Sequence, residues 1–496
     1  MPVRVSVVVA VHDPGPQFED LVDSLLAQTL PAREFEVLFC DDGSDAPTRA
    51  RLAAVTAGQP HWQVLALEHS GWPGKPRNAG IDAARGRYLF FADHDDALGA
   101  EALERLCDLA DTLGSDVVVG KLVGVGRTLP LGTFARDVER AVLGVDPLLD
   151  LLTPHKLFRT AFVREQGIRF PEGRVRLEDH LFVMRAYFAA RVISILASYP
   201  CYYWAVRQDR PSASAGLIDP APYYASMEQV LDVVEAGAGR GELLDRLLPH
   251  WYGTKVLRRL GGAALLDYPD GYAAQLLAVA RPLVARRFPA RIDVHLPFPL
   301  RVRSALLRAG RDADLHALAA VEAAITGWAT ATAVRWTDDG RLRVDVRAGV
   351  TGAAALVFVP AAPGGPAARW RPPVPLAPDV ATPDVLDAGD DLARDDVQLF
   401  LRDEEDSAFY GQGEPAPGAT VTAFVDPRTG RSGRPVTARS ALLVQVRHAG
   451  WVEVVPVQVD AAVLAAAGAH RVVGRQVLRV GRTADGYLLL EAEQTP

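Results

Sequence analysis

The segment 93–96 reads Asp-His-Asp-Asp and places three carboxylates within four residues. Clustered carboxylates repel one another, and a hard divalent cation such as Mg²⁺ or Mn²⁺ relieves that repulsion while it also binds the phosphates of a substrate. The segment therefore predicts a metal site with Asp95 and Asp93 as ligands. The alternative is that these residues cap the helix expected over 101–113, a position that suits Asp96.

Two further acidic pairs, Asp41-Asp42 and Glu178-Asp179, could also take part in chemistry. The first pair is followed by Gly-Ser and fits a turn, but a carboxylate here could instead accept hydrogen bonds from a nucleotide base. The second pair suits the first turn of a helix, where the helix dipole favours acidic residues, or it could supply a general base toward a hydroxyl. The residues alone leave both alternatives open for each pair.

A basic segment is a candidate for binding phosphate groups. Lys75, Arg77 and Asn78 lie in the Gly- and Pro-rich stretch 71–80, next to the expected start of a helix. Backbone N–H groups at a helix N-terminus attract anions, and cationic side chains add to that attraction. The alternative is an ordinary basic surface loop.

A polar loop after the apolar run 192–196 contains Arg207, Ser212 and Ser214. It is a candidate for contacts with a diphosphate or with a second substrate. The aromatic run 202–204 that precedes the loop either belongs to the core or stacks on a sugar. Since alternate residues of a strand point in opposite directions, Tyr202 or Tyr203 is expected in the core.

The elements around these residues alternate between strand and helix. Buried-strand runs cover 3–11, 35–40, 64–68 and 88–92, and helical spacing covers 18–28, 78–84 and 101–113. This alternation predicts an α/β domain with a mostly parallel sheet. In such sheets, ligands bind beyond the carboxyl ends of the strands, and the polar clusters at His12-Asp13, Asp41 and Asp93 all follow strand ends. We therefore expect these clusters to form one site.

The rest of the chain has two other patterns. Residues 221–327 have apolar residues at helical spacing between Gly and Pro breaks, whereas residues 328–496 alternate with a period of two and contain frequent turn residues. The 496-residue chain is therefore predicted to have three parts: an α/β domain over 1–220, a helical linker over 221–327 and an all-β sandwich region of one or two modules over 328–496.

Composition excludes several classes of protein. A net charge of −8 does not suit a nucleic-acid-binding protein, which usually carries a basic domain. Three widely spaced cysteines indicate neither a disulfide framework nor a zinc site. No run approaches the roughly 20 apolar residues that a membrane span needs, and the N-terminus lacks the pattern of a signal peptide. A cytoplasmic protein is expected.

Taken together, the motifs of residues 3–214 resemble the family 2 glycosyltransferases, which have the GT-A fold. The matching segments are the opening strand with its polar end at 5–13, Asp-Asp-Gly-Ser at 41–44, Arg-Asn-Ala-Gly at 77–80, Asp-His-Asp at 93–95 and Glu-Asp at 178–179. His12 departs from the Tyr and Asn that are common around this position, so its contact with the base stays open. The residues implied to bind the nucleotide sugar are Ala10, His12, Asp13, Asp41, Lys75, Arg77, Asn78, Asp93 and His94.

The resemblance implies a single in-line displacement that inverts the sugar's configuration. Asp41 would hold the base of a UDP-sugar, and Asp95, helped by Asp93, would hold Mn²⁺ or Mg²⁺ on the diphosphate. Asp179, next to Glu178, would take the proton of the acceptor hydroxyl.

The order of the domains is similar to that of the wall teichoic acid poly(ribitol phosphate) N-acetylglucosaminyltransferases. This similarity implies GlcNAc as the sugar, an anionic polymer or glycan as the acceptor, a homotrimer formed through the C-terminal region and a place at the inner face of the membrane. Two alternatives remain: a non-catalytic, carbohydrate-binding scaffold with a degenerate transferase domain, and a sugar nucleotidyltransferase. The latter typically has a Gly-rich loop after the first strand, which residues 11–16 lack.

Overall fold

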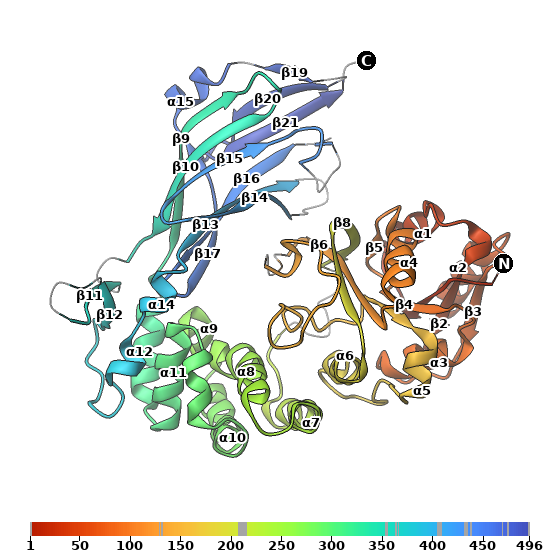
Figure 1. The fold of residues 1–496 in the computed structure, drawn as a ribbon, viewed down its shortest axis with the longest axis horizontal. Helices are drawn as coiled ribbons and strands as arrows, with labels where there is room; N and C mark the ends of the chain where they lie inside the picture. The colour runs from red at the N-terminus through yellow and green to blue at the C-terminus, as the bar shows by residue number, and fades with distance from the viewer. Residues whose placement is uncertain are drawn as a thin grey trace. The chain divides into compact units, whose positions relative to one another are not determined.

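The computed structural model describes residues 2–127, 129, 132–206, 216–352, 356–362, 365, 367–403, 409–430, 435–436, 439–468, 470–473 and 476–494. The chain divides into two compact units, Met1–Leu244 and Asp245–Pro496. Each unit is described by itself below, with the elements labelled as in Figure 1.

An eight-stranded sheet forms the centre of the first unit. Its strands, in spatial order, are β3 (Trp62–Ala66), β2 (Phe35–Asp41), β1 (Val5–Val11), β4 (Tyr88–Asp93), β7 (Leu157–Arg159), β6 (Val117–Val125), β8 (Ile193–Ala205) and β5 (Ala97–Leu98). The pairs β3–β2, β2–β1, β1–β4 and β6–β8 are parallel, whereas β7 and β5 run antiparallel to their neighbours. The predicted mostly parallel α/β sheet is therefore confirmed.

Helices cover both faces of this sheet. The helices of the first unit are α1 (Phe18–Leu26), α2 (Ala46–Thr56), α3 (Gly74–Ala83), α4 (Ala102–Leu113), α5 (Thr160–Glu165), α6 (Glu178–Ala189) and α7 (Pro220–Ala238). In Figure 1, α1 and α4 lie on one side of the strands and α3 and α5 on the other. Every residue of β1 and β2 is buried, as expected for central strands covered on both faces.

The alternation of side chains along β1 divides the core into two layers. Val5, Val7 and Val9 belong to one apolar cluster with residues of α1 and α4. Val8 points the other way, toward α3, and a Cβ on Gly80 would lie only 2.2 Å from its Cγ1 atom. The absence of a side chain at Gly80 therefore lets α3 pack directly on the sheet.

Helix α3 begins at Gly74, four residues before the predicted start at 78. Gly74 fits there because a Cβ on this residue would lie 2.1 Å from the carbonyl oxygen of Pro171. Lys75, Arg77 and Asn78 are consequently on the helix itself and not in a loop that precedes it. The early start is a correction to the sequence prediction, and it explains how these three side chains point in different directions.

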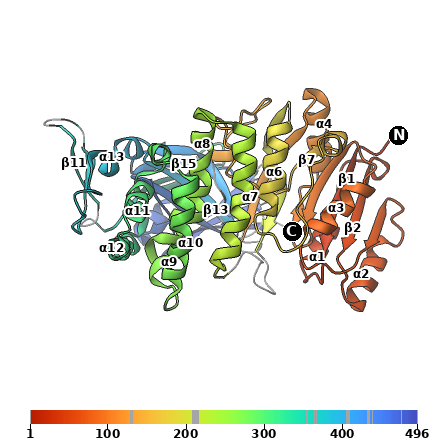
Figure 2. The ribbon, with the colours of Figure 1, turned by 90° about the horizontal axis from the view of Figure 1, so that it is seen from below.

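The helix α7 lies beside α6 (Figure 2), and α8 (Glu242–Trp251) follows it. The second unit continues with a π-helical turn, η3 (Tyr252–Val256), the 3₁₀ turns η4 (Leu257–Leu260) and η5 (Ala290–His295), and the helices α9 (Gly262–Leu266), α10 (Tyr272–Arg287), α11 (Phe298–Arg308) and α12 (Asp312–Ala323). Arg303 of α11 and Glu322 of α12 form a buried ion pair at 2.7 Å. Helices thus dominate this stretch, as predicted.

Strands dominate from Gly327 onward. One sheet contains β15 (Thr420–Val425), β10 (Leu342–Val350), β9 (Gly327–Trp336) and β18 (Gln458–Val459), and a hairpin is formed by β11 (Val357–Pro360) and β12 (Ala367–Arg371). Another sheet contains β14 (Phe409–Pro417), β13 (Asp396–Asp403), β16 (Ser440–His448), β21 (Leu488–Gln494), β20 (Gln476–Arg482), β19 (Arg471–Val473) and β17 (Trp451–Pro456). Short helices α13 (Pro383–Leu386), α14 (Gly389–Leu392) and α15 (Ala461–Ala466) lie between them in the sequence. The predicted strand-rich region is therefore present.

The alternating pattern of β10 matches its burial. Leu342, Val344 and Val346 are buried, and the charged residues between them are partly exposed.

No helix in the described ranges has the length and apolar character that crossing a bilayer requires.

Candidate active site

The polar residues that follow the central strands come together at one edge of the sheet. In the strand register, Val11 pairs with Asp41 and Ala10 pairs with Asp93, so the ends of β1, β2 and β4 are level. His94, directly after β4, reaches back to the first strand, where its Nδ1 lies 3.1 Å from the carbonyl oxygen of Ala10. The predicted convergence of these strand ends is therefore found.

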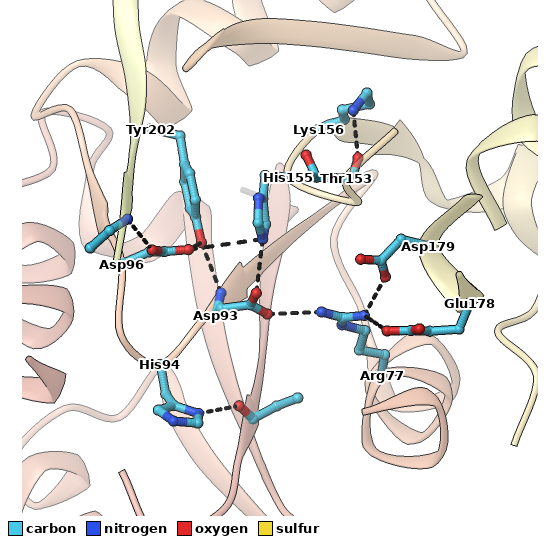
Figure 3. A network of polar contacts seen from close by, with 12 residues as sticks. Arg77, Asp93, His94, Asp96, Thr153, His155, Lys156, Glu178, Asp179 and Tyr202 are labelled. Carbon is cyan, nitrogen blue, oxygen red and sulfur yellow. Dashed lines mark hydrogen bonds and ion pairs between the residues drawn. The ribbon is translucent and has the colours of Figure 1, made fainter. Parts of the chain in front are cut away.

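Arg77 connects this edge with helix α6 (Figure 3). Its Nη2 donates to Asp93 Oδ1 at 2.9 Å, and its Nη1 donates to Asp179 Oδ1 at 2.6 Å. Glu178 lies farther away, with its Oε1 3.6 Å from Nη1. The Arg77 side chain is only 4% exposed, and its guanidinium lies over the ring of Phe170. The guanidinium is thus fixed between two carboxylates from different parts of the sequence.

This arrangement changes the acidity of the carboxyl groups. Burial alone would raise the pKa of Asp93, but the adjacent Arg77 and His155 outweigh burial and hold that pKa below its ordinary value. For Asp179, burial prevails over the attraction of Arg77, and its pKa is raised. Burial, reinforced by the charge of Asp179, raises the pKa of Glu178 to about 8. The two acidic residues of α6 therefore hold protons more strongly than Asp93 does.

A second network lies on the other side of Asp93. His155 Nε2 is 3.2 Å from Asp93 Oδ2 and 4.0 Å from Asp96 Oδ2. The Tyr202 hydroxyl accepts from the Asp93 backbone N–H at 2.9 Å and donates to Asp96 Oδ2 at 2.7 Å. Asp96 Oδ1 accepts from the Ala205 N–H at 2.7 Å. Asp96 therefore anchors the end of β8 instead of capping helix α4, whose N-cap is Glu101.

Burial and the neighbouring carboxylates raise the pKa of Asp96. A carboxyl group that is fully buried and surrounded by Asp93 and Asp95 is more stable when protonated. Asp95, in contrast, is partly exposed. The acidic segment 93–96 therefore contains three carboxyl groups in three different environments.

Lys156 holds the loop that carries His155. Its Nζ donates to the carbonyl oxygens of Leu151, at 2.9 Å, and Thr153. The side chain is fully buried, and this burial lowers its pKa to about 7. These two hydrogen bonds close the loop 151–156 and fix the imidazole of His155 beside Asp93.

The end of β2 makes turn contacts. Asp41 Oδ1 accepts from the Ser44 N–H at 3.0 Å, as the turn interpretation predicts. Asp42 accepts from the N–H groups of Ser70 and Gly71, both at 2.9 Å, and so holds the segment that leads into α3. The ring of His12 stacks on that of His69, with centroids 4.3 Å apart.

Three other predicted residues make contacts outside the Arg77 network. Asn78 is buried, and its side-chain amide bonds to the backbone N–H and carbonyl of Phe170 and to Glu172. Lys75 Nζ donates to the carbonyl oxygen of Glu68 at 3.1 Å. Asp13 Oδ1 accepts from the Asp45 N–H at 3.0 Å. Their predicted contacts with a nucleotide sugar stay predictions.

The predicted polar loop residues Arg207, Ser212 and Ser214 lie outside the described residues. Just before them, Tyr202 is fully buried, which confirms its predicted place in the core. Trp204 stacks under the guanidinium of Arg127 at 4.0 Å. Strand β8 reaches Ala205, so the aromatic run belongs to a strand that is much longer than the predicted 192–196.

Sequence reasoning missed three residues of this site, His155, Lys156 and Arg127, and it missed the anchoring role of Asp96. One signal was available, because Lys156 is one of only four lysines among 53 basic residues. A lysine directly after a histidine at the start of the apolar run 157–158 is an unusual pair. Their proximity to Asp93 depends on the antiparallel pairing of β7 with β4, which the pattern does not predict.

Comparisons with known proteins agree with this geometry. Residues 6–172 match the family model described as glycosyl transferase family 2, and residues 220–319 match the glycosyl transferase TarS linker domain. A poly(ribitol-phosphate) beta-glucosyltransferase of Bacillus spizizenii is 33% identical over 238 residues, which cover 47% of this chain and 37% of the relative. The poly(ribitol-phosphate) beta-N-acetylglucosaminyltransferase TarS of Staphylococcus aureus is 33% identical over 229 residues, covering 46% and 40%. The match thus spans less than half the length of these relatives.

Solved structures extend the similarity. The crystal structure of S. aureus TarS 1–349 in complex with UDP-GlcNAc is similar with a TM-score of 0.56 and 27% identity, over 63% of this chain and 89% of that chain. The crystal structure of S. aureus TarS aligns with 100% of this chain and 86% of that one at a TM-score of 0.56 and 19% identity, which shows a shared fold.

Proposed function

We propose that this chain, whose residues 6–172 form a family 2 glycosyl transferase domain, is an inverting, metal-dependent glycosyltransferase. Its donor would be a UDP-sugar, with GlcNAc as the first candidate, and its acceptor a hydroxyl of a polyol-phosphate polymer. The observation that carries the proposal is the position of Arg77, which links Asp93 of the strand-end motif to Asp179 of α6. One guanidinium thus holds together the two carboxylates that a displacement at a sugar carbon requires.

Asp179 is the proposed general base. It is the carboxylate in direct contact with Arg77, whereas Glu178 is more distant and has a pKa of about 8, so it is largely protonated near neutral pH. A raised pKa suits a base, because proton affinity closer to the working pH increases the driving force for proton transfer. Arg77 opposes the effect of burial on the pKa of Asp179 and so favours its ionised form, which is the form that can accept a proton. Asp179 would accept the proton of the acceptor hydroxyl as that oxygen attacks the anomeric carbon.

The residues of segment 93–96 fit a divalent cation. Atoms of Asp93, Asp96 and His155 lie within 4.8 Å of one another, and carboxylate oxygens are ligands that suit Mn²⁺ or Mg²⁺. Because Asp96 is already engaged by Tyr202 and Ala205, Asp93 and Asp95 are the proposed carboxylate ligands. Such an ion, when bound, would neutralise charge on the leaving diphosphate.

The nucleotide would lie at the ends of β1 and β2. Asp41 and the stacked rings of His12 and His69 face this edge, and Ala10, Asp13 and His94 line it. Lys75, Arg77 and Asn78 come from the first turns of α3, where the helix dipole favours the diphosphate. Arg207, Ser212 and Ser214 complete the proposal as contacts to the acceptor or the diphosphate.

The sugar and the acceptor are proposed from the relatives. One similar crystal structure contains UDP-GlcNAc, and similar proteins are named for glucosyl or N-acetylglucosaminyl transfer to poly(ribitol-phosphate). We extend the proposal to an immunoglobulin-like fold for the C-terminal sandwich, trimerisation through residues 328–496 and action at the inner face of the cytoplasmic membrane. Light scattering on the full chain tests the trimer, and a monomer would end that part of the proposal.

The test of the function is release of UDP from a panel of UDP-sugars with Mn²⁺, in the presence and absence of EDTA. We expect slow hydrolysis of one donor that EDTA abolishes and that Asp179→Asn lowers by about 10²–10⁴-fold. Asp82→Asn is the matched control, because Asp82 is an exposed carboxylate on α3 that pairs with Arg169. A polyol-phosphate acceptor should increase turnover with that donor.

Two other outcomes would favour the alternatives. If calorimetry detects no binding of UDP and every donor stays intact, the chain is a carbohydrate-binding scaffold. If the chain instead forms a UDP-sugar from UTP and a sugar phosphate, it is a sugar nucleotidyltransferase.

A further inference from the structure

His155 is a buried imidazole whose ring is held on one face. Its side chain is 2% exposed, and its ring stacks on that of Tyr202 with centroids 4.3 Å apart and planes 19° apart. The ring of Trp204 lies edge-on to that of His155, with centroids 6.2 Å apart. Lys156 holds the loop that carries His155 through its hydrogen bond to the carbonyl oxygen of Leu151. The ring therefore has one fixed orientation, with Nε2 directed at the strand-end carboxylates (Figure 3).

The two nitrogens of this ring have very different surroundings. Nε2 lies 3.2 Å from Asp93 Oδ2 and 4.0 Å from Asp96 Oδ2. Nδ1 is buried and has no hydrogen-bond partner among the residues that the structure describes. In the part of the chain that the structure describes, the polar contacts of this buried ring are all made by Nε2, toward Asp93 and Asp96. The ring therefore presents one nitrogen to the strand-end carboxylates, which is the arrangement that a cation shared by an imidazole and a carboxylate requires.

The separation of the two atoms suits neighbouring ligands of one cation. Two donors that each bind an ion at about 2.1 Å and at a right angle are about 3.0 Å apart. The 3.2 Å between His155 Nε2 and Asp93 Oδ2 is close to this value. The other oxygen of Asp93, Oδ1, accepts a hydrogen bond from Arg77, which also contacts the proposed base, Asp179. Oδ2 is therefore the oxygen of this carboxylate that would bind the cation.

We propose that His155 is a nitrogen ligand of the divalent cation, beside Asp93 and Asp95. This inference rests on the metal dependence of the proposed function and adds a ligand that lies 62 residues from Asp93 in the sequence. An imidazole nitrogen favours divalent ions of the first transition series, such as Mn²⁺ and Co²⁺, over Mg²⁺, which prefers oxygen ligands. The site should therefore prefer Mn²⁺ or Co²⁺ to Mg²⁺.

The experiment is pulsed electron paramagnetic resonance of Mn²⁺ bound to the full chain, with and without UDP. A directly coordinated imidazole produces a ¹⁴N modulation of the electron spin echo, and labelling the histidines with ¹⁵N changes that signal. We expect the modulation in the wild type and its loss in His155→Phe, which keeps a ring against Tyr202 but has no nitrogen. We also expect the Kd for Mn²⁺ to rise by about 10–100-fold or more in this variant.

His61→Phe is the matched control, because this histidine also lies among aromatic rings, those of Phe35 and Trp62, but it directly precedes β3 and so lies at the other end of that strand from the carboxyl edge. Its ¹⁴N signal and Mn²⁺ affinity should equal those of the wild type. His155→Asn, a smaller polar variant, should also lose the ¹⁴N modulation, which keeps the test decisive if His155→Phe folds poorly.

Bound Mn²⁺ without ¹⁴N modulation in the wild type would overturn the inference, and so would a modulation that persists in both variants. A protein that binds no Mn²⁺ with or without UDP would overturn it as well. UDP release is measured separately on the same preparations, so metal-dependent turnover without a histidine signal would end the inference and leave the proposed function intact.

Discussion

Arg77 donates to Asp179 at 2.6 Å, across 102 residues of sequence. The same guanidinium donates to Asp93, so its loss would leave two partly buried carboxylates without their shared cation. Substitutions of Arg77 can therefore measure separately how this contact affects turnover and how it affects the stability of the fold.

We predict that Arg77→Lys lowers turnover by about 10²-fold, because one ammonium cannot hold both carboxylates in place. Arg77→Met should also lower the free energy of unfolding by about 3 kcal/mol, the smaller end of the range for a broken ion pair, since both carboxylates are partly exposed. UDP release and urea unfolding measure the two effects. Arg85→Lys, at an exposed arginine that pairs with Glu36, is the control, and an equal loss of turnover there would contradict the prediction.

The raised pKa of Glu178 predicts how stability depends on pH. Its pKa is about 8 in the folded chain against 4.5 when unfolded, so the folded state binds more protons between these values. The stability that Glu178 contributes is therefore complete below about pH 4.5 and decreases as the pH rises toward 8. Glu178→Gln should remove this part of the slope. Urea unfolding of both proteins from pH 5 to 8 checks it, and parallel slopes would refute it.

The lowered pKa of Lys156 predicts that stability depends on pH with the opposite sign. Burial lowers its pKa to about 7 from 10.5, so the unfolded state binds more protons between these values. The contribution of this group to stability is present above about pH 10.5 and is lost as the pH falls toward 7. Lys156→Met should make the free energy of unfolding less dependent on pH between 7 and 10. Lys75, which is only partly buried, serves as the control, and Lys75→Met should leave the slope unchanged.

The close packing of α3 on the sheet predicts a coupled pair. Gly80→Ala should destabilise the first unit by about 1–3 kcal/mol, because the added Cβ would lie 2.2 Å from Val8 Cγ1. Val8→Ala removes that methyl group, so the double variant should be more stable than the sum of the two single changes predicts. Thermal unfolding of the four proteins measures the coupling, and strict additivity would count against the contact.

Much of this protein follows from local sequence. Buried β-branched runs such as 5–11 need helices on both faces, and the acidic segments 41–42 and 93–96 directly follow such runs, so a parallel sheet with carboxylates at one edge was predictable. The predicted ends of elements were less accurate. Helix α3 begins at Gly74 because of a contact with Pro171, which lies about a hundred residues away and leaves no local pattern.

Only the tertiary structure decided how the site is completed. The approach of His155 to Asp93 depends on the antiparallel pairing of β7 with β4, and the approach of Asp179 to Arg77 depends on where α6 begins. Periodicity specifies which face of an element is buried, but it does not specify which distant element covers that face. The sequence by itself therefore determined the strands, their carboxylates and the kind of chemistry. The packing of remote segments decided which arginine, histidine or tyrosine side chain each carboxylate contacts.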